Sequence, residues 1–162
     1  MEDGKNKMEK LKVIYEDNHI IVVEKTPNIA SQADKTGDID MLTMVKQYIK
    51  EKYNKPGNVY VGLVHRLDRP VGGIMVFAKT SKAASRLCEE VRNKTFEKHY
   101  LAVVDGKIES KVGVLEDYLY KDERNNISKV VSKEKKNAKL AKLDYEVLVY
   151  DEIKNLSLLK VN

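Results

Sequence analysis

Cysteine is nearly absent from this chain, which contains one, Cys88, among 162 residues. A single cysteine excludes an intramolecular disulfide and a zinc site built from several cysteines. Cys88 lies in an apolar pattern with helical spacing, so we expect it to be a small residue of the core. The sequence also has no apolar run long enough to cross a membrane and no visible signal peptide. We therefore expect a cytoplasmic protein with no membrane partner.

Charge is plentiful but nearly balanced, with 30 lysines and arginines against 25 aspartates and glutamates. The net charge of +5 is compatible with nucleic acid or another anionic surface, but so small an excess does not decide between them. The lysine-rich stretch 129–142 is either a solvated face or a contact with phosphates. The length and the apolar content of 42% predict one soluble globular domain with a real core.

Hydrophobic patterning predicts many strands and two helices. The expected strands are 11–15, 20–24, 59–64, 74–78, 98–104, 112–120, 127–132, 141–150 and 156–161. The expected helices are 41–53, with Asp40 as the N-cap, and 81–93, with Thr80 or Ser81 as the N-cap. Residues 1–10 are polar, and we expect them to be a frayed tail. This pattern indicates an α+β fold.

The stretch 59–80 places a charged turn between two apolar, β-branched runs. The charged side chains in it are His65, Arg66, Asp68 and Arg69. Rigid strands often present chemistry on such a turn, although an ordinary solvated hairpin loop is the alternative. Nearby arginines are expected to keep Asp68 ionised, and an ionised carboxylate in a dry site serves as nucleophile or base. Gly72 and Gly73 would let the backbone approach another group, such as a ligand, closely.

The same stretch resembles the signature of RluA-type pseudouridine synthases. The matching residues are His65-Arg66-Leu67-Asp68, Arg69-Pro70-Val71-Gly72-Gly73-Ile74 and Phe77-Ala78-Lys79-Thr80. In that family the aspartate of the His-Arg-Leu-Asp motif is catalytic, which implies this role for Asp68. Many members have Ser or Thr where this chain has Gly72, so one hydroxyl contact is missing here.

Two further segments carry the resemblance. Lys98-His99-Tyr100-Leu101-Ala102, followed by Val104-Asp105-Gly106, is similar to the family's Lys-x-Tyr-x-Ala…Gly motif. The resemblance implies that Tyr100 stacks near the target base, while a plain core aromatic is the alternative. Glu24-Lys25-Thr26-Pro27 is similar to the Asn/Glu-Lys-Pro segment of the family, with a threonine inserted.

The resemblance implies that uridine is isomerised to pseudouridine in structured RNA, either ribosomal or transfer RNA. The bond between the ring nitrogen and the sugar breaks, the uracil turns, and carbon 5 bonds to the sugar. This chemistry requires no cofactor and no metal, and the sequence has no nucleotide-binding fingerprint or metal-ligand cluster. The target base must leave the RNA stack, and the implied RNA-binding residues are His65, Arg66 and Arg69. The implied fold is mixed, with a largely antiparallel central sheet and flanking helices.

The resemblance also implies that part of the catalytic domain is missing. In the family, a strand like 156–161 leads into a segment Thr-Gly-Arg-x-His-Gln-Ile-Arg that supplies a basic residue, whereas this chain ends at Asn162. We expect residues 11–162 to be a catalytic domain truncated at its C-terminus, with an incomplete sheet edge through which copies could associate. A non-catalytic RNA-binding module or an inactive fragment is the alternative function. A nucleoside hydrolase is disfavoured because it needs an activated water, generally through a metal or a second carboxylate.

Overall fold

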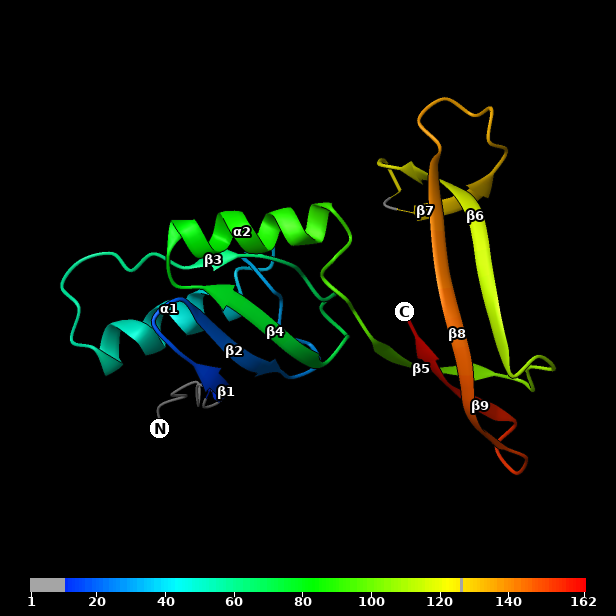
Figure 1. The fold of residues 1–162 in the computed structure, drawn as a ribbon, viewed down its shortest axis with the longest axis horizontal. Coiled ribbons are helices and arrows are strands. Elements are labelled where there is room, and N and C mark those ends of the chain that lie inside the picture. Colours follow the sequence, from blue (N-terminus) through cyan, green and yellow to red (C-terminus); the bar gives the residue numbers. More distant parts are fainter. Residues whose placement is uncertain (1–10, 126) are drawn as a thin grey trace, which may run out of the picture. The chain divides into compact units, whose positions relative to one another are not determined.

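The structure, a computed structural model, describes residues 11–125 and 127–162 (Figure 1). It divides into two compact units, one ending at Phe96 and the other formed by residues 97–162. All pairings between the described strands of either unit are antiparallel. The expected tail at residues 1–10 lies outside the described residues. None of the described helices is long and apolar enough to span a membrane.

The first unit is a sheet between two helices (Figure 1). Its elements are β1 (Lys12–Glu16), β2 (Ile20–Lys25), α1 (Met41–Lys52), β3 (Gly62–Leu63), β4 (Gly73–Ala78) and α2 (Ser81–Arg92). The strand order is β1-β2-β4-β3, so the two strands richest in apolar residues lie in the middle. The predicted α+β architecture, with antiparallel strands and flanking helices, is confirmed.

Alternation along the central strands builds the two halves of the core. Ile21 and Val23 of β2 lie with Met75 and Phe77 of β4 on the face that α1 covers, and all four side chains are fully buried. Val76 and the other alternate residues face α2 instead. A strand that buries both faces in this way reads as a continuous apolar run, which is the pattern in the sequence.

The helices begin where the sequence predicts. Asp40 accepts a hydrogen bond from the Thr43 N–H (3.1 Å), and Thr80 accepts one from the Ala83 N–H (3.2 Å). These bonds satisfy backbone donors that a helix leaves unpaired at its first turn. Of the two candidate caps for α2, Thr80 is therefore the one used.

The expected strand at 59–64 is much shorter in the structure. Only Gly62 and Leu63 pair with β4, opposite Ala78 and Phe77. A Cβ atom on Gly62 would lie 2.8 Å from the Cβ of Ala84, so glycine is needed where β3 passes beneath α2. The β-branched residues before it signalled burial rather than strand pairing.

The second unit is a five-stranded sheet. Its strands are β5 (Tyr100–Asp105), β6 (Val112–Asp122), β7 (Ile127–Val131), β8 (Lys139–Asp151) and β9 (Leu156–Val161), in the order β5-β9-β8-β6-β7. The pattern of β8 predicts Val147 and Val149 on the same face, but this is wrong. The register shifts between these two residues, and Val149 is 56% exposed. Such a bulge reverses the alternation locally.

A buried carboxylate ties three elements of the first unit together. Glu16, at the end of β1, accepts hydrogen bonds from Lys79 (2.6 Å), Lys52 (2.7 Å) and Tyr53 (2.8 Å). Burial alone raises the pKa of Glu16, but the bonds from Lys52, Lys79 and Tyr53 outweigh it and lower the pKa to about 2. The cluster fixes the last turn of α1 and the end of β4 against β1.

We predict that this cluster makes the first unit sensitive to acid. The folded pKa of Glu16 lies below its ordinary value of 4.5, so the unfolded chain binds the proton more tightly. Stability is then complete above about pH 4.5 and falls by about 3 kcal/mol as the pH drops toward 2. Glu16→Gln should remove this dependence and lower stability at pH 7, measured by urea unfolding against pH.

Glu24→Gln is the matched control, because Glu24 pairs with Lys12 on the surface and its side chain is 38% exposed. It should change stability by less than about 1 kcal/mol. Equal losses in the two variants would contradict the assignment to Glu16.

Candidate active site

The charged motif lies in the loop between β3 and β4, and two buried residues anchor it. Val64 packs into the cluster beneath α2, whereas Leu67 packs into the cluster beneath α1. The side chains of Arg66 and Asp68 beside them are exposed. Anchors on opposite faces of the sheet therefore fix the course of the loop and leave the Asp68 carboxylate at the surface.

Ser31 pins the residue before Asp68. Its side chain is buried, and its Oγ donates to the Leu67 carbonyl (2.6 Å) and accepts from the Leu67 N–H (3.0 Å). The hydroxyl thereby takes the place that a neighbouring strand would fill. Both backbone groups of Leu67 are paired although the loop has left the sheet, as buried backbone requires.

Lys25 fastens the residues after Asp68. This lysine, at the end of β2, is 1% exposed, and its Nζ donates to the carbonyls of Val71 (2.5 Å), Arg69 (3.0 Å) and Thr26 (3.3 Å). Burial and the positive charge of Arg69 lower the pKa of Lys25, while the negative charge of Asp68 opposes them. The buried ammonium therefore holds the turn through its backbone and lies near enough to the carboxylate to interact with its charge.

Two backbone hydrogen bonds complete the turn. The Asn28 N–H donates to the Arg69 carbonyl (2.7 Å), and the Val71 N–H donates to the Asp68 carbonyl (3.0 Å). Asn28 has a φ of 71°, a left-handed conformation that asparagine tolerates better than most residues. The segment after β2 is thus shaped to receive the Asp68 turn.

Arg69 points into the neighbouring loop at residues 31–40. Its guanidinium bonds to Thr36 (2.7 Å), Asp38 (2.9 Å) and Asp34 (3.2 Å), and the bond to Asp38 helps hold the pKa of that carboxyl below its usual range. Within the described residues, no ion pair joins Asp68 to Arg66 or Arg69. The arginine expected beside the carboxylate instead braces the loop that carries Ser31.

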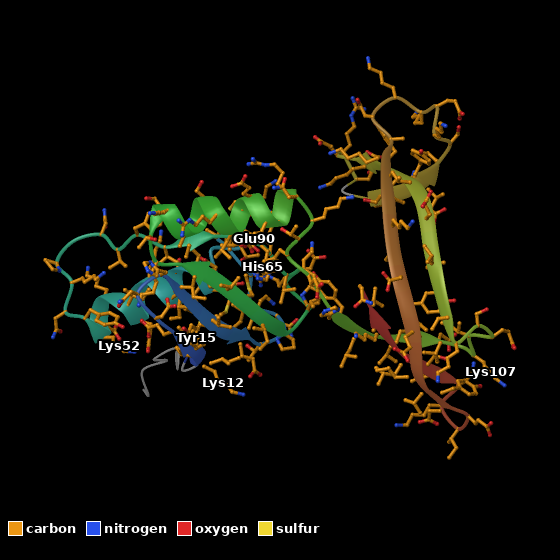
Figure 2. All side chains as sticks on the ribbon, viewed as in Figure 1. Lys12, Tyr15, Lys52, His65, Glu90 and Lys107 are labelled. Carbon is orange, nitrogen blue, oxygen red and sulfur yellow. The ribbon has the colours of Figure 1, made fainter. Side chains whose placement is uncertain are left out.

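The His65 side chain makes a hydrogen bond to β4 just past the end of the short strand β3. Its Nε2 accepts a hydrogen bond from the Val76 N–H (3.2 Å), which lies beyond the last backbone pair of β3 with β4. The His65 ring, labelled in Figure 2, lies 5.7 Å from the ring of Phe96. His65 therefore has a structural contact of its own, while Arg66 is exposed.

The two glycines after the turn occupy positions that restrict side chains, Gly72 by close packing and Gly73 by its backbone conformation. A Cβ atom on Gly72 would lie 3.0 Å from Cδ of Pro27, and Gly73 has a φ of 150°. Pro27 belongs to the Glu-Lys-Thr-Pro segment that also supplies Lys25. The Glu-Lys-Thr-Pro segment and the glycines after Asp68, which are far apart in the sequence, are thus in contact. The space expected beside Gly72 for a ligand is filled by Pro27.

Tyr100, the second predicted catalytic residue, belongs to the other unit. It is the first residue of β5, pairs with Val161 of β9, and is 38% exposed. Its ring is therefore partly available on the surface of that sheet.

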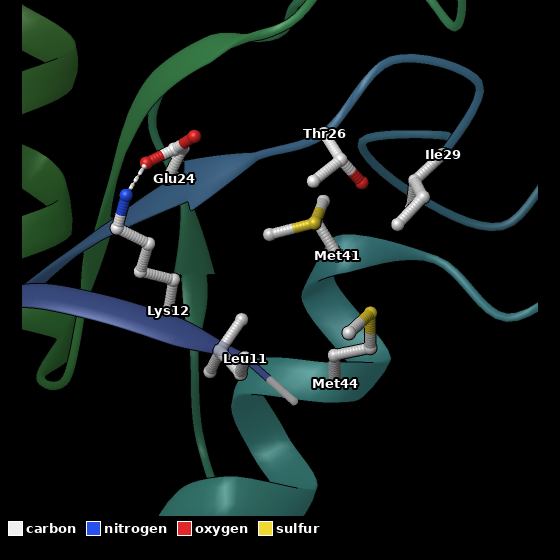
Figure 3. Close-up of a pocket in the computed structure, with 7 residues that line it drawn as sticks. All are labelled: Leu11, Lys12, Glu24, Thr26, Ile29, Met41 and Met44. Carbon is white, nitrogen blue, oxygen red and sulfur yellow. Dashed lines mark ion pairs between the residues drawn. The ribbon is translucent and has the colours of Figure 1, made fainter. Parts of the chain in front are cut away.

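A separate small hollow lies between β1, β2 and α1 (Figure 3). Its lining is Leu11, Lys12, Glu24, Thr26, Ile29, Met41 and Met44. None of the predicted site residues is among them. Over residues 11–125 and 127–162, no group of three or more His, Cys, Asp or Glu side chains is placed to hold a metal ion.

Sequence reasoning gave no site role to the two residues that hold the Asp68 turn, although it quoted Lys25 within the Glu-Lys-Thr-Pro segment. Lys25 had a signal, because it follows Ile21 and Val23 at alternate positions facing α1, where a lysine needs buried partners. Ser31 had none, since a serine in a polar loop is ordinary. Its role depends on a contact with Leu67, 36 residues away.

Comparison with known proteins decides the family. A family model described as RNA pseudouridylate synthase matches residues 19–162. The chain belongs to this family. An uncharacterized RNA pseudouridine synthase of Mycoplasma genitalium is 35% identical over 157 residues, covering 94% of this chain and 48% of the relative. The tRNA pseudouridine synthase C of Haemophilus influenzae is 31% identical, covering 85% of this chain and 55% of the relative.

The likeness extends to solved structures of the family. Human RNA pseudouridylate synthase domain containing 1 matches with a TM-score of 0.74 at 20% identity, covering 99% of this chain and 61% of that chain. The fold is therefore that of a pseudouridylate synthase domain, as the motifs around Asp68 and Tyr100 predict. The chain spans about half the length of the curated relatives it matches.

We predict that Ser31→Ala loosens the Asp68 turn. The change leaves the N–H and carbonyl of Leu67 unpaired in a buried place, which should cost about 2 kcal/mol. Urea unfolding measures the loss, and amide hydrogen exchange should accelerate at Leu67 more than in β4.

Ser85→Ala is the control, because Ser85 is exposed on α2. It should leave both measurements within about 0.5 kcal/mol of the original chain. An unchanged Leu67 amide in Ser31→Ala would contradict the proposed role of the hydroxyl.

Proposed function

We propose that this chain carries the catalytic aspartate of an enzyme that isomerises uridine to pseudouridine in ribosomal or transfer RNA. Asp68 is the catalytic residue of the proposal. The observation that carries it is an exposed carboxylate on a turn whose backbone is held by buried Ser31 and Lys25. A held carboxylate that remains open to a ligand suits a reaction in which it must meet one sugar or base in a fixed geometry.

The proposed role of Asp68 is that of nucleophile or base. A carboxylate can form a covalent intermediate or accept a proton from a positioned substrate. The buried ammonium of Lys25 lies on the backbone side of the turn, where its Nζ donates to the Arg69 carbonyl (3.0 Å). Isomerisation rearranges bonds within one nucleotide, so the proposal includes no cofactor and no metal.

The remaining predicted residues are assigned around this centre. Arg66 is exposed beside Asp68 and is proposed to hold the RNA backbone or fill the space that the flipped base leaves. Tyr100 is proposed to stack on the target base. His65 and Arg69 are proposed to shape the RNA-binding loop, since their hydrogen bonds fasten the β4 edge and the loop at residues 31–40.

The proposal places the protein in the cytoplasm with RNA as its partner. Residues 11–162 are proposed to belong to one catalytic domain, with Asp68 in the first compact unit and Tyr100 in the second. A relative named ribosomal large subunit pseudouridine synthase D in Borreliella burgdorferi supports ribosomal RNA as one substrate class, and the tRNA enzyme of Haemophilus influenzae supports the other. Association of copies through a sheet edge belongs to the same proposal.

The test is pseudouridine formation in unmodified ribosomal and transfer RNA transcripts. Asp68→Asn should lower the rate by about 100-fold or more, because the amide cannot act as nucleophile or base. Its affinity for RNA should stay within about twofold of the original chain. Asp117→Asn is the matched control, since Asp117 is exposed on β6, and it should keep the full rate.

Two outcomes would overturn the proposal. Equal and measurable rates of pseudouridine formation in the original chain and Asp68→Asn would remove Asp68 from the chemistry. Salt-dependent RNA binding with no pseudouridine from any transcript would favour a non-catalytic RNA-binding module.

A further inference from the structure

The positive charge of this chain is concentrated in one segment of the second unit. Residues 121–142 hold eight of the 30 lysines and arginines but three of the 25 aspartates and glutamates. The rest of the chain then has 22 basic and 22 acidic residues, which cancel. The whole net charge of +5 therefore lies in residues 121–142. The segment runs from the end of β6 through β7 to the start of β8, at the top of the second unit in Figure 1.

The register gathers two of these lysines on one face of the sheet. Lys139 of β8 lies opposite Leu119 of β6, and Lys121 of β6 lies opposite Ser128 of β7. Paired residues share a face, as do residues two apart on one strand. Lys121 and Lys139 therefore flank the same strip of sheet, and both are exposed.

The strip is hollowed. Its lining includes Leu119, Lys121, Arg124, Ser128, Lys139 and Ala141. Leu119 and Ala141 are partly buried and form an apolar floor, while the three cations are exposed around it. The hollow thus combines a recessed apolar surface with a positively charged margin.

The three cations of the hollow outnumber the two acidic residues that line it. Asp122 and Glu123 also line the hollow. The Asp122 carboxylate accepts hydrogen bonds within its own turn, from the Asn125 side chain (2.9 Å) and the Arg124 N–H (3.1 Å). Within the described residues, Lys121, Arg124 and Lys139 have no ion pair, whereas Lys142 pairs with Glu116 at 3.4 Å.

We propose that this hollow, built from residues of the second unit, is a binding site for the phosphate backbone of RNA. Exposed cations without acidic partners gain affinity by displacing the counterions of phosphates. A single strand or a loop of RNA can place a sugar on the recessed floor, which a flat lipid surface does not reach. The choice of RNA rests on the proposed function, and the site deepens it by holding part of the substrate RNA through its phosphates.

The test removes the three cations together. The chain with Lys121→Ala, Arg124→Ala and Lys139→Ala is compared with one carrying Lys107→Ala, Lys111→Ala and Lys154→Ala. The control removes the same charge from exposed positions at the other end of the unit, where Figure 2 labels Lys107. The probes are a fluorescein-labelled unmodified tRNA transcript and an oligouridine of about 20 nucleotides, titrated by anisotropy between about 50 and 200 mM salt.

The hollow variant should bind RNA about tenfold more weakly at about 100 mM salt, and its log-log salt slope should fall by about 2. The control variant should lose less than about threefold. Lys121→Arg, Arg124→Lys and Lys139→Arg together should restore binding, because they keep the charges. Equal losses in the hollow and control variants, or no loss in either, would overturn the site.

A lipid arm separates RNA from a membrane surface. Vesicles of phosphatidylcholine with about 30% phosphatidylserine should not bind the original chain measurably better than the hollow variant. Vesicle binding that depends on these cations while RNA binding does not would overturn the proposal in favour of a membrane contact.

Binding and chemistry can fail separately. If Asp68→Asn abolishes pseudouridine formation while the hollow variant binds RNA normally, the hollow is wrong and the proposed function stands. If the hollow variant loses RNA binding while no protein makes pseudouridine, the site stands and the proposed activity fails.

Discussion

The structure around Asp68 depends on one buried ammonium. The Nζ of Lys25 donates to the carbonyl of Thr26, just after β2, and to the carbonyls of Arg69 and Val71 in the charged turn. Burying a charged amine is costly unless its donors are all used. Here three carbonyl oxygens take them, so the cost is offset and the turn is fixed to the sheet.

Other contacts are arranged around that clamp. Ser31 pairs both backbone groups of Leu67, Arg69 braces the loop that carries Ser31, and Pro27 lies against Gly72. Each element therefore supports the backbone rather than the carboxylate of Asp68. Such a division suits a catalytic group, because its position is set by buried contacts while its oxygens remain available to substrate.

Much of this could be predicted from sequence where a local pattern carries the information. The helices and their caps followed from Asp40 and Thr80, and alternation or apolar runs gave most strands, because these depend on near neighbours. The short β3, the bulge between Val147 and Val149 and the role of Ser31 could not be predicted, since each depends on residues distant in the chain. The sequence motif around Asp68 predicted a catalytic carboxylate. The ion pairs of Arg69 with Asp34 and Asp38 could be seen only in the folded structure.

The clamp itself can be tested by amide hydrogen exchange in Lys25→Met, which keeps an apolar side chain of similar length but removes the ammonium. We expect amide exchange at Leu67 and Val71 to accelerate about tenfold more than exchange at Phe77 in β4. Lys12→Met, on exposed β1, should leave all three amides unchanged. Turn amides that keep their protection in Lys25→Met would contradict the claim that the buried ammonium holds Asp68 in place.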